Sequence, residues 1–333
     1  MAGGAALLGL AAALPSAAAA ASRTRVRARP APAPPPAPPP PPPFKPDALV
    51  ATLDDATQLY YVTGAFGAPV IFVHGSLSDY SYWDAQLGPF ADKYRVFAYS
   101  RRYNWPNQNP PRKGYSAVVD AEDLAGLIGK LGAAPAHIVG HSYGAFAALF
   151  LAARHPDLVR TLTLAEPPAM SLLAHVPGGQ AAAGAAMLKD VRANMVAPMK
   201  KAFANKHDAP AHDTEAAVRI FIDYVKANPG AWDAFSEADK AATLKDAHEW
   251  EVIFAGGELF PEIRPDEVAA IKAPVLMLSG AKSYPFLGLI DQALVALLPG
   301  AQHVVLPNAT HQMWLEEPQA CREAVFRLID AAH

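Results

Sequence analysis

Six short apolar runs, separated by helical patterns, constrain the fold of this chain more than any other feature. Each run is rich in β-branched residues and nearly continuous in hydrophobicity, which is typical of strands buried on both faces of a parallel sheet. The alternation of such runs with helical periods predicts an α/β fold with a mostly parallel central sheet and crossover helices. The predicted strands are residues 70–74, 95–100, 136–141, 159–165, 274–279 and 302–306, and the clearest helical patterns are residues 118–131, 145–155 and 319–332.

The alternation stops after the fourth run. Between residues 170 and 263 no convincing strand pattern occurs, and Ala, Lys, Met and Trp recur at helical spacing. We therefore predict a helical cap over residues 170–263, inserted into a core made of residues 49–169 and 264–333.

The first 48 residues have a different composition. Residues 1–22 are almost all small and apolar and end in the alanine-rich sequence that signal peptidase cleaves, so we predict an export signal. Alanine and glycine insert weakly into membranes and Pro15 interrupts the run, which argues against a stable membrane span. Residues 23–48 are dominated by proline, which predicts a disordered linker of polyproline II character or, alternatively, a ligand for proline-recognition modules.

The N-terminal pattern predicts a location. A working signal implies export to the bacterial periplasm or the medium, and a silent one implies the cytoplasm. No Lys or Arg precedes Arg23, and such alanine-rich runs often follow a twin-arginine in exported bacterial proteins. We therefore expect the true start to lie upstream of Met1.

Composition excludes several classes of function. The net charge is −3 without a basic stripe, so we expect no nucleic-acid partner. The chain has one cysteine, Cys321, and its 11 histidines lack paired spacing, so we expect no metal and no cofactor. The oligomeric state is not predicted by any pattern.

Residues 138–146 read IVGHSYGAF and contain the pattern G-x-S-x-G around Ser142. A strand precedes it and a helix follows, which is the context of a nucleophile elbow. The tight turn needs small residues at Gly140 and Gly144. A serine hydroxyl is a poor nucleophile alone, so Ser142 needs a base and a group that orients the base.

Together with HGS at residues 74–76, Trp83 and the sequence NATHQMWLEEP, the elbow resembles the α/β-hydrolase superfamily, in particular serine hydrolases with a helical cap. The resemblance covers residues 49–333 and implies that the base is His311, which follows the last predicted strand. It also implies an oxyanion hole formed by the backbone N–H groups of Ser76 and Tyr143. We interpret His74 as a structural residue that braces this loop rather than as a second base.

The acid departs from the common pattern of that superfamily. Most members place an Asp after the strand that is APVLMLSG here, but no carboxylate follows until Asp291, within a predicted helix. Haloalkane dehalogenases and zearalenone lactonases instead carry the acid after the strand that follows the elbow helix. Glu166 has that position, 24 residues after Ser142. We predict Glu166 as the acid, with Asp291 as the alternative; Glu166 would otherwise cap a segment of the helical insertion.

A serine nucleophile implies acyl transfer, and we expect cleavage of an ester or lactone of a small, largely apolar substrate. The predicted substrate contacts come from the loop after the second predicted strand and from the cap: Arg102, Tyr103, Trp105, Met170 and Trp232. Arginines in such loops often serve as structural braces instead, and apolar cap residues often form plain core. Two other functions fit the same scaffold: a cofactor-free oxygenase or perhydrolase, and a non-catalytic ligand-binding protein.

Overall fold

The computed structural model describes residues 46–204 and 213–332. The predicted export signal lies outside these residues, as does the predicted linker up to residue 45. Within the described ranges, no helix combines the length and the apolar character needed to cross a bilayer.

The centre of the fold is an eight-stranded sheet with the strand order β1-β2-β4-β3-β5-β6-β7-β8. All neighbours from β4 to β8 run parallel, whereas β2 pairs antiparallel with both β1 and β4. This confirms the predicted mostly parallel α/β sheet. The strands are β1 (Leu49–Thr52), β2 (Gln58–Gly64), β3 (Pro69–Val73), β4 (Arg95–Tyr99), β5 (Ala136–His141), β6 (Val159–Ala165), β7 (Val275–Gly280) and β8 (Gln302–Leu306).

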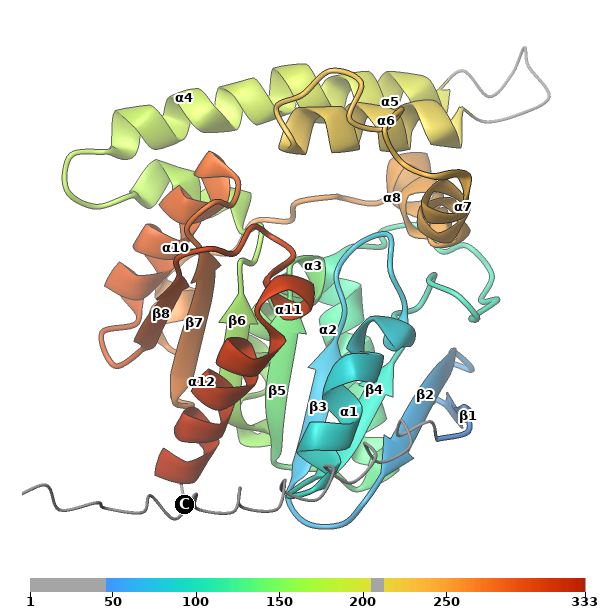
Figure 1. Ribbon diagram of the computed structural model, residues 1–333, viewed down its shortest axis with the longest axis vertical. Helices are drawn as coiled ribbons and strands as arrows, with labels where there is room; N and C mark the ends of the chain where they lie inside the picture. The colour runs from blue at the N-terminus through green and yellow to red at the C-terminus, as the bar shows by residue number, and fades with distance from the viewer. Residues whose placement is uncertain (1–45, 205–212, 333) are drawn as a thin grey trace, which may run out of the picture. The chain divides into compact units, whose positions relative to one another are not determined.

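Helices cover both faces of this sheet (Figure 1). Alternate residues of a strand point to opposite faces, so Val70 and Phe72 pack with α1 and α12, while Ile71 and Val73 pack with α2 and α3. Both faces are therefore buried, which is why the strands lack a polar alternation. The helices of these layers are α1 (Asp84–Ala91), α2 (Ala117–Leu131), α3 (Tyr143–Arg154), α10 (Pro285–Leu297), α11 (Met313–Glu316) and α12 (Pro318–Ala331).

The chain between β6 and β7 forms the helical insertion, and its described residues contain no strand. Figure 1 shows α4, α5 and α6 lying beyond the carboxyl ends of the parallel strands, with α7 and α8 beside them. The insertion therefore covers the carboxyl ends of the strands, where the predicted site residues lie. Within the predicted bounds of 170–263 its helices are α4 (Ala181–Val191), α5 (Ala197–Ala204), α6 (Thr214–Val225), α7 (Glu237–Lys245) and α8 (His248–Gly256). The short helix α9 (Pro265–Ala269) follows, in the part of the chain predicted as core.

Asp246, between α7 and α8, links the insertion to the core. Its Oδ1 accepts a hydrogen bond of 2.7 Å from the backbone N–H of Trp105. Burial is the main reason that the pKa of Asp246 rises from 3.8 to about 7, with nearby Asp79 acting in the same direction and the Trp105 N–H opposing it. The native state therefore retains a proton that the unfolded chain loses above pH 4.

We predict that the free energy of unfolding falls by a few kcal/mol between about pH 4 and pH 7 through Asp246, because each pKa unit is worth about 1.4 kcal/mol. Asp246→Asn keeps the acceptor for Trp105 and removes the titration. Urea unfolding at several pH values should therefore show a shallower pH dependence for the variant. Equal slopes for the two proteins would contradict the prediction.

Candidate active site

The elbow has the strained geometry that the sequence predicts. Ser142 lies between β5 and α3 with φ of 53°, a left-handed conformation that side chains rarely adopt. A Cβ on Gly140 would lie 2.6 Å from the Cα of Ala145, and one on Gly144 would lie 2.3 Å from the carbonyl oxygens of Val73 and His74. Both positions therefore require glycine because backbone approaches closely.

Glu166 follows β6 directly and also has a positive φ, 50°. One carboxylate oxygen, Oε1, accepts a hydrogen bond of 2.7 Å from the backbone N–H of Gly280, at the end of β7. The other, Oε2, accepts one of 2.6 Å from the hydroxyl of Ser283 and lies 2.5 Å from Nδ1 of His311. Glu166 is thus buried, held by two donors and joined to the imidazole.

Asp291 has a different environment. It lies in α10, and its Oδ2 accepts a hydrogen bond of 2.5 Å from the hydroxyl of Ser279. Burial raises the pKa of Asp291 well above its ordinary value, and the charge of Glu166 adds to this shift. Among the described residues, the carboxylate bonded to the imidazole of His311 is that of Glu166.

His311 is fixed from the elbow side as well. Nε2–H of His141, the residue before the nucleophile, donates a hydrogen bond of 2.9 Å to the backbone carbonyl of His311. Burial lowers the pKa of His141 well below its usual value, and the charge of His311 lowers it further, so His141 stays neutral. The two rings lie 4.7 Å apart between centroids. His141, which sequence analysis did not single out, thus positions His311.

Two cavities meet at Ser142 and His311. The inner one has a free volume of about 40 Å³ and is bounded by apolar side chains, among them Met170, Met195, Phe221, Trp250, Phe260 and Leu287. Ser76 and Tyr143, the predicted oxyanion residues, also line it. The outer one is larger, about 320 Å³, and includes polar residues such as Lys226, Thr243 and Gln312.

Three predicted substrate contacts lie away from these cavities. Arg102 donates to the carboxylates of Asp123 and Asp55, so it braces the loop. Tyr103 and Trp105 line a separate surface hollow, and the Tyr103 hydroxyl donates to the carbonyl of Pro110.

The two predicted substrate contacts in the helical cap, Met170 and Trp232, lie in different environments. Met170 lines the inner cavity, whereas Trp232 is buried and donates its indole N–H to Glu215 at 2.8 Å. Trp232 is therefore part of the packing of the cap. The other apolar residues that line the cavity, among them Met195, Phe221 and Trp250, come from separate segments of the chain, and no local sequence pattern singled them out.

His74 has the bracing role that we expected from the sequence. Its Nε2 accepts a hydrogen bond of 3.0 Å from the backbone N–H of Arg101. The proton is therefore on Nδ1, which donates to the carbonyl of Gly75 at 2.8 Å. Burial and, secondarily, the charge of Arg101 lower the pKa of His74 to about 3. The ring is therefore neutral and too weakly basic to replace His311 as the base.

A model of the alpha/beta hydrolase family matches residues 70–324. The match covers more than half of the chain, in agreement with the strand order and the elbow. The chain therefore belongs to the alpha/beta hydrolase family.

Known relatives are hydrolases with modest identity. The chain is 26% identical over 273 residues to 2-(acetamidomethylene)succinate hydrolase of Mesorhizobium japonicum, covering 80% of this chain and 89% of that protein. It is 26% identical over 260 residues to the sn-1-specific diacylglycerol lipase ABHD11 of Mus musculus, covering 77% and 79%. A thermophilic esterase from Thermogutta terrifontis has a similar fold, with a TM-score of 0.64 at 21% identity, over 86% of this chain and 99% of that one.

We predict that Glu166→Gln lowers kcat by at least about 100-fold, because an amide does not stabilise the imidazolium and favours the wrong tautomer of His311. Asp291→Asn is the matched variant. Asp291 bonds to Ser279 and the imidazole of His311 bonds to Glu166, so kcat of Asp291→Asn should stay within about threefold of wild type. Steady-state kinetics on a chromogenic ester measures both, and the reverse ranking of the two variants would identify Asp291 as the acid.

Proposed function

We propose that this chain is a serine hydrolase that cleaves an ester or lactone of a small, largely apolar substrate through an acyl-enzyme. The observation that carries the proposal is the buried hydrogen bond between Glu166 and His311, beside a cavity that Ser142 also lines. The family supports hydrolysis in general, and the names of the two relatives, a hydrolase and a lipase, agree with it.

In the proposed mechanism, His311 takes the proton of the Ser142 hydroxyl as the oxygen attacks the substrate carbonyl. Glu166 keeps Nδ1 of His311 protonated, which leaves Nε2 as the base, and it stabilises the imidazolium that forms. The backbone N–H groups of Ser76 and Tyr143 bind the oxyanion. Tyr143 is the first residue of α3, so its N–H has no partner within the helix and the helix dipole favours negative charge there.

His311 then donates its proton to the leaving oxygen, and the alcohol departs. Water attacks the acyl-enzyme with His311 again as the base, and the acid product leaves Ser142 free. With a lactone, the leaving oxygen stays joined to the acyl group through the ring carbons, so no separate alcohol departs and the second step releases a hydroxy acid. None of these steps needs a metal or cofactor.

We further propose that the inner cavity receives the acyl group and the outer cavity the leaving group. The inner cavity is small and apolar, which favours short acyl chains, and the outer one is larger and offers polar side chains. We also propose that the protein is exported, because residues 1–22 have the composition of an export signal.

The first test is labelling by a fluorophosphonate, which reacts with activated serines. We expect purified protein to be labelled and Ser142→Ala to be unlabelled. Hydrolysis of a chromogenic ester in the absence of oxygen and peroxide should accompany labelling, which separates a hydrolase from an oxygenase or perhydrolase. Absence of both labelling and turnover would instead favour the hypothesis that the chain is a non-catalytic ligand-binding protein.

A second test concerns the acyl group. We expect kcat/KM to fall more than tenfold between butyrate and dodecanoate p-nitrophenyl esters, since the inner cavity does not hold a long chain. Met195→Ala should reduce this difference, because it enlarges the cavity. Met199→Ala is the control, since Met199 is equally buried on the next turn but does not line the cavity. An equal effect of both variants would argue against the assignment of the inner cavity.

A further inference from the structure

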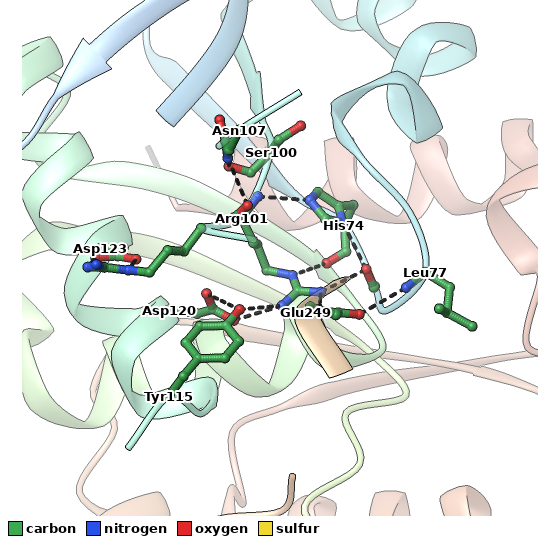
Figure 2. Close-up of polar contacts among 11 residues, drawn as sticks. His74, Leu77, Ser100, Arg101, Asn107, Tyr115, Asp120, Asp123 and Glu249 are labelled. Carbon is green, nitrogen blue, oxygen red and sulfur yellow. Dashed lines mark hydrogen bonds and ion pairs between the residues drawn. The ribbon is translucent and has the colours of Figure 1, made fainter. Parts of the chain in front are cut away.

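Arg101 lies at the centre of a buried polar cluster that the steps above do not use (Figure 2). It follows β4, and its guanidinium contacts two buried carboxylates, Asp120 of α2 at 2.7 Å and Glu249 of α8. These two carboxylates raise the pKa of Arg101 well above its usual value, although burial opposes them. A fully buried cation with two carboxylate partners keeps a fixed position.

The same guanidinium holds the loop that carries Ser76. Its Nη2 donates a hydrogen bond of 3.0 Å to the carbonyl oxygen of Gly75, and its Nε donates one of 3.2 Å to that of His74. The carbonyl of Gly75 also accepts the bond from Nδ1–H of His74. Two donors therefore converge on one carbonyl, and one of them is a cation.

The carbonyl of Gly75 and the N–H of Ser76 belong to the same peptide unit. This unit is planar and trans, so its N–H points away from the oxygen that Arg101 holds. Within the described residues, that N–H has no hydrogen-bond partner. Donors on the carbonyl also polarise the peptide and make its N–H a stronger donor.

Glu249 fixes the loop at a second point. Its Oε1 accepts a hydrogen bond of 2.9 Å from the backbone N–H of Leu77, while its other oxygen pairs with Arg101. Leu77 has a φ of 55°, a conformation that needs such support. Glu249 thus bonds directly to Leu77, after Ser76, and acts through Arg101 on the carbonyl of Gly75, before it.

We propose that Glu249 and Arg101 are positioning residues of the oxyanion hole, so that the cap orients a donor to the transition state without touching substrate. This inference rests on the proposed function, because it assumes that an oxyanion forms at Ser142. It predicts that loss of the Glu249 charge weakens binding of the transition state more than binding of the substrate.

The test is Glu249→Gln, which keeps an acceptor for Leu77 but removes the negative partner of Arg101. We expect kcat to fall about tenfold with KM unchanged, which is less than the 10² to 10³ lost when an oxyanion donor is removed outright. A trifluoromethyl ketone, which adds to the serine and forms an oxyanion, should bind about tenfold more weakly. The parent methyl ketone should bind equally to both proteins.

Asp123→Asn is the matched control. Asp123 is a buried carboxylate of α2 that pairs with Arg102, the neighbour of Arg101, and it has no bond to the loop of residues 74–77. We expect it to lower the melting temperature while kcat and affinity for the trifluoromethyl ketone stay within twofold of wild type. A purely structural role of Glu249 would make the two variants behave alike.

If Glu249→Gln does not fold, a second variant provides the same test. Asp120→Asn loosens Arg101 from the side of α2 and should produce the same selective loss of kcat and of trifluoromethyl ketone affinity. Unchanged affinity in whichever variant folds, or an increase in KM at constant kcat, would overturn the inference. If wild-type protein is neither labelled at Ser142 nor active, the proposed function itself has failed, so the two failures are distinguishable.

Discussion

The close approach of α3 to the end of β3 is the constraint on which the site depends. Because Gly144 has no side chain, the first turn of α3 packs directly on the carbonyl groups of Val73 and His74. This contact brings the elbow and the loop of Ser76 together, and the remaining groups reach the same place because parallel strands end at one edge of the sheet. Glu166 arrives after β6 and His311 after β8.

Three residues of the site have strained backbone conformations. Ser142, Glu166 and Leu77 all have positive φ values, and each lies at the end of a strand or in the loop that follows it. Such conformations persist only where surrounding bonds determine them. Glu166 is held by Gly280 and Ser283, and Leu77 by Glu249, so tertiary hydrogen bonds offset the local cost.

Much of the fold could be predicted because its strands are buried on both faces and therefore stand out as apolar runs. All six predicted strands are present within one or two residues. The two that were missed, β1 and β2, form the antiparallel edge of the sheet, where exposed positions interrupt the apolar pattern. Ser142 and His311 could be proposed from the sequence because each lies in a local motif, and Glu166 could be proposed because it follows a predicted strand.

Residues that act through distant contacts could not be predicted in this way. Glu249 and Arg101 are 148 positions apart, and neither the sequence around HEWEV nor that around YSRRY indicates that they pair. The same sequence did suggest two roles for the arginines, and the structure favours the brace over the substrate contact. Trp105 and Trp232 illustrate a related difficulty. An aromatic residue type is suited to lining a pocket, but the type alone does not tell whether the side chain points into that pocket.

The position of Glu249 on α8 has a consequence for redesign of this protein. The insertion lies between β6 and β7, so in a redesign it could be exchanged as one continuous segment. Here the exchanged segment would take with it one of two counter-charges of a fully buried arginine and leave a cation short of a partner. A chimaera would need to bring a carboxylate to the same point, so the insertion and the core of this chain have to change together.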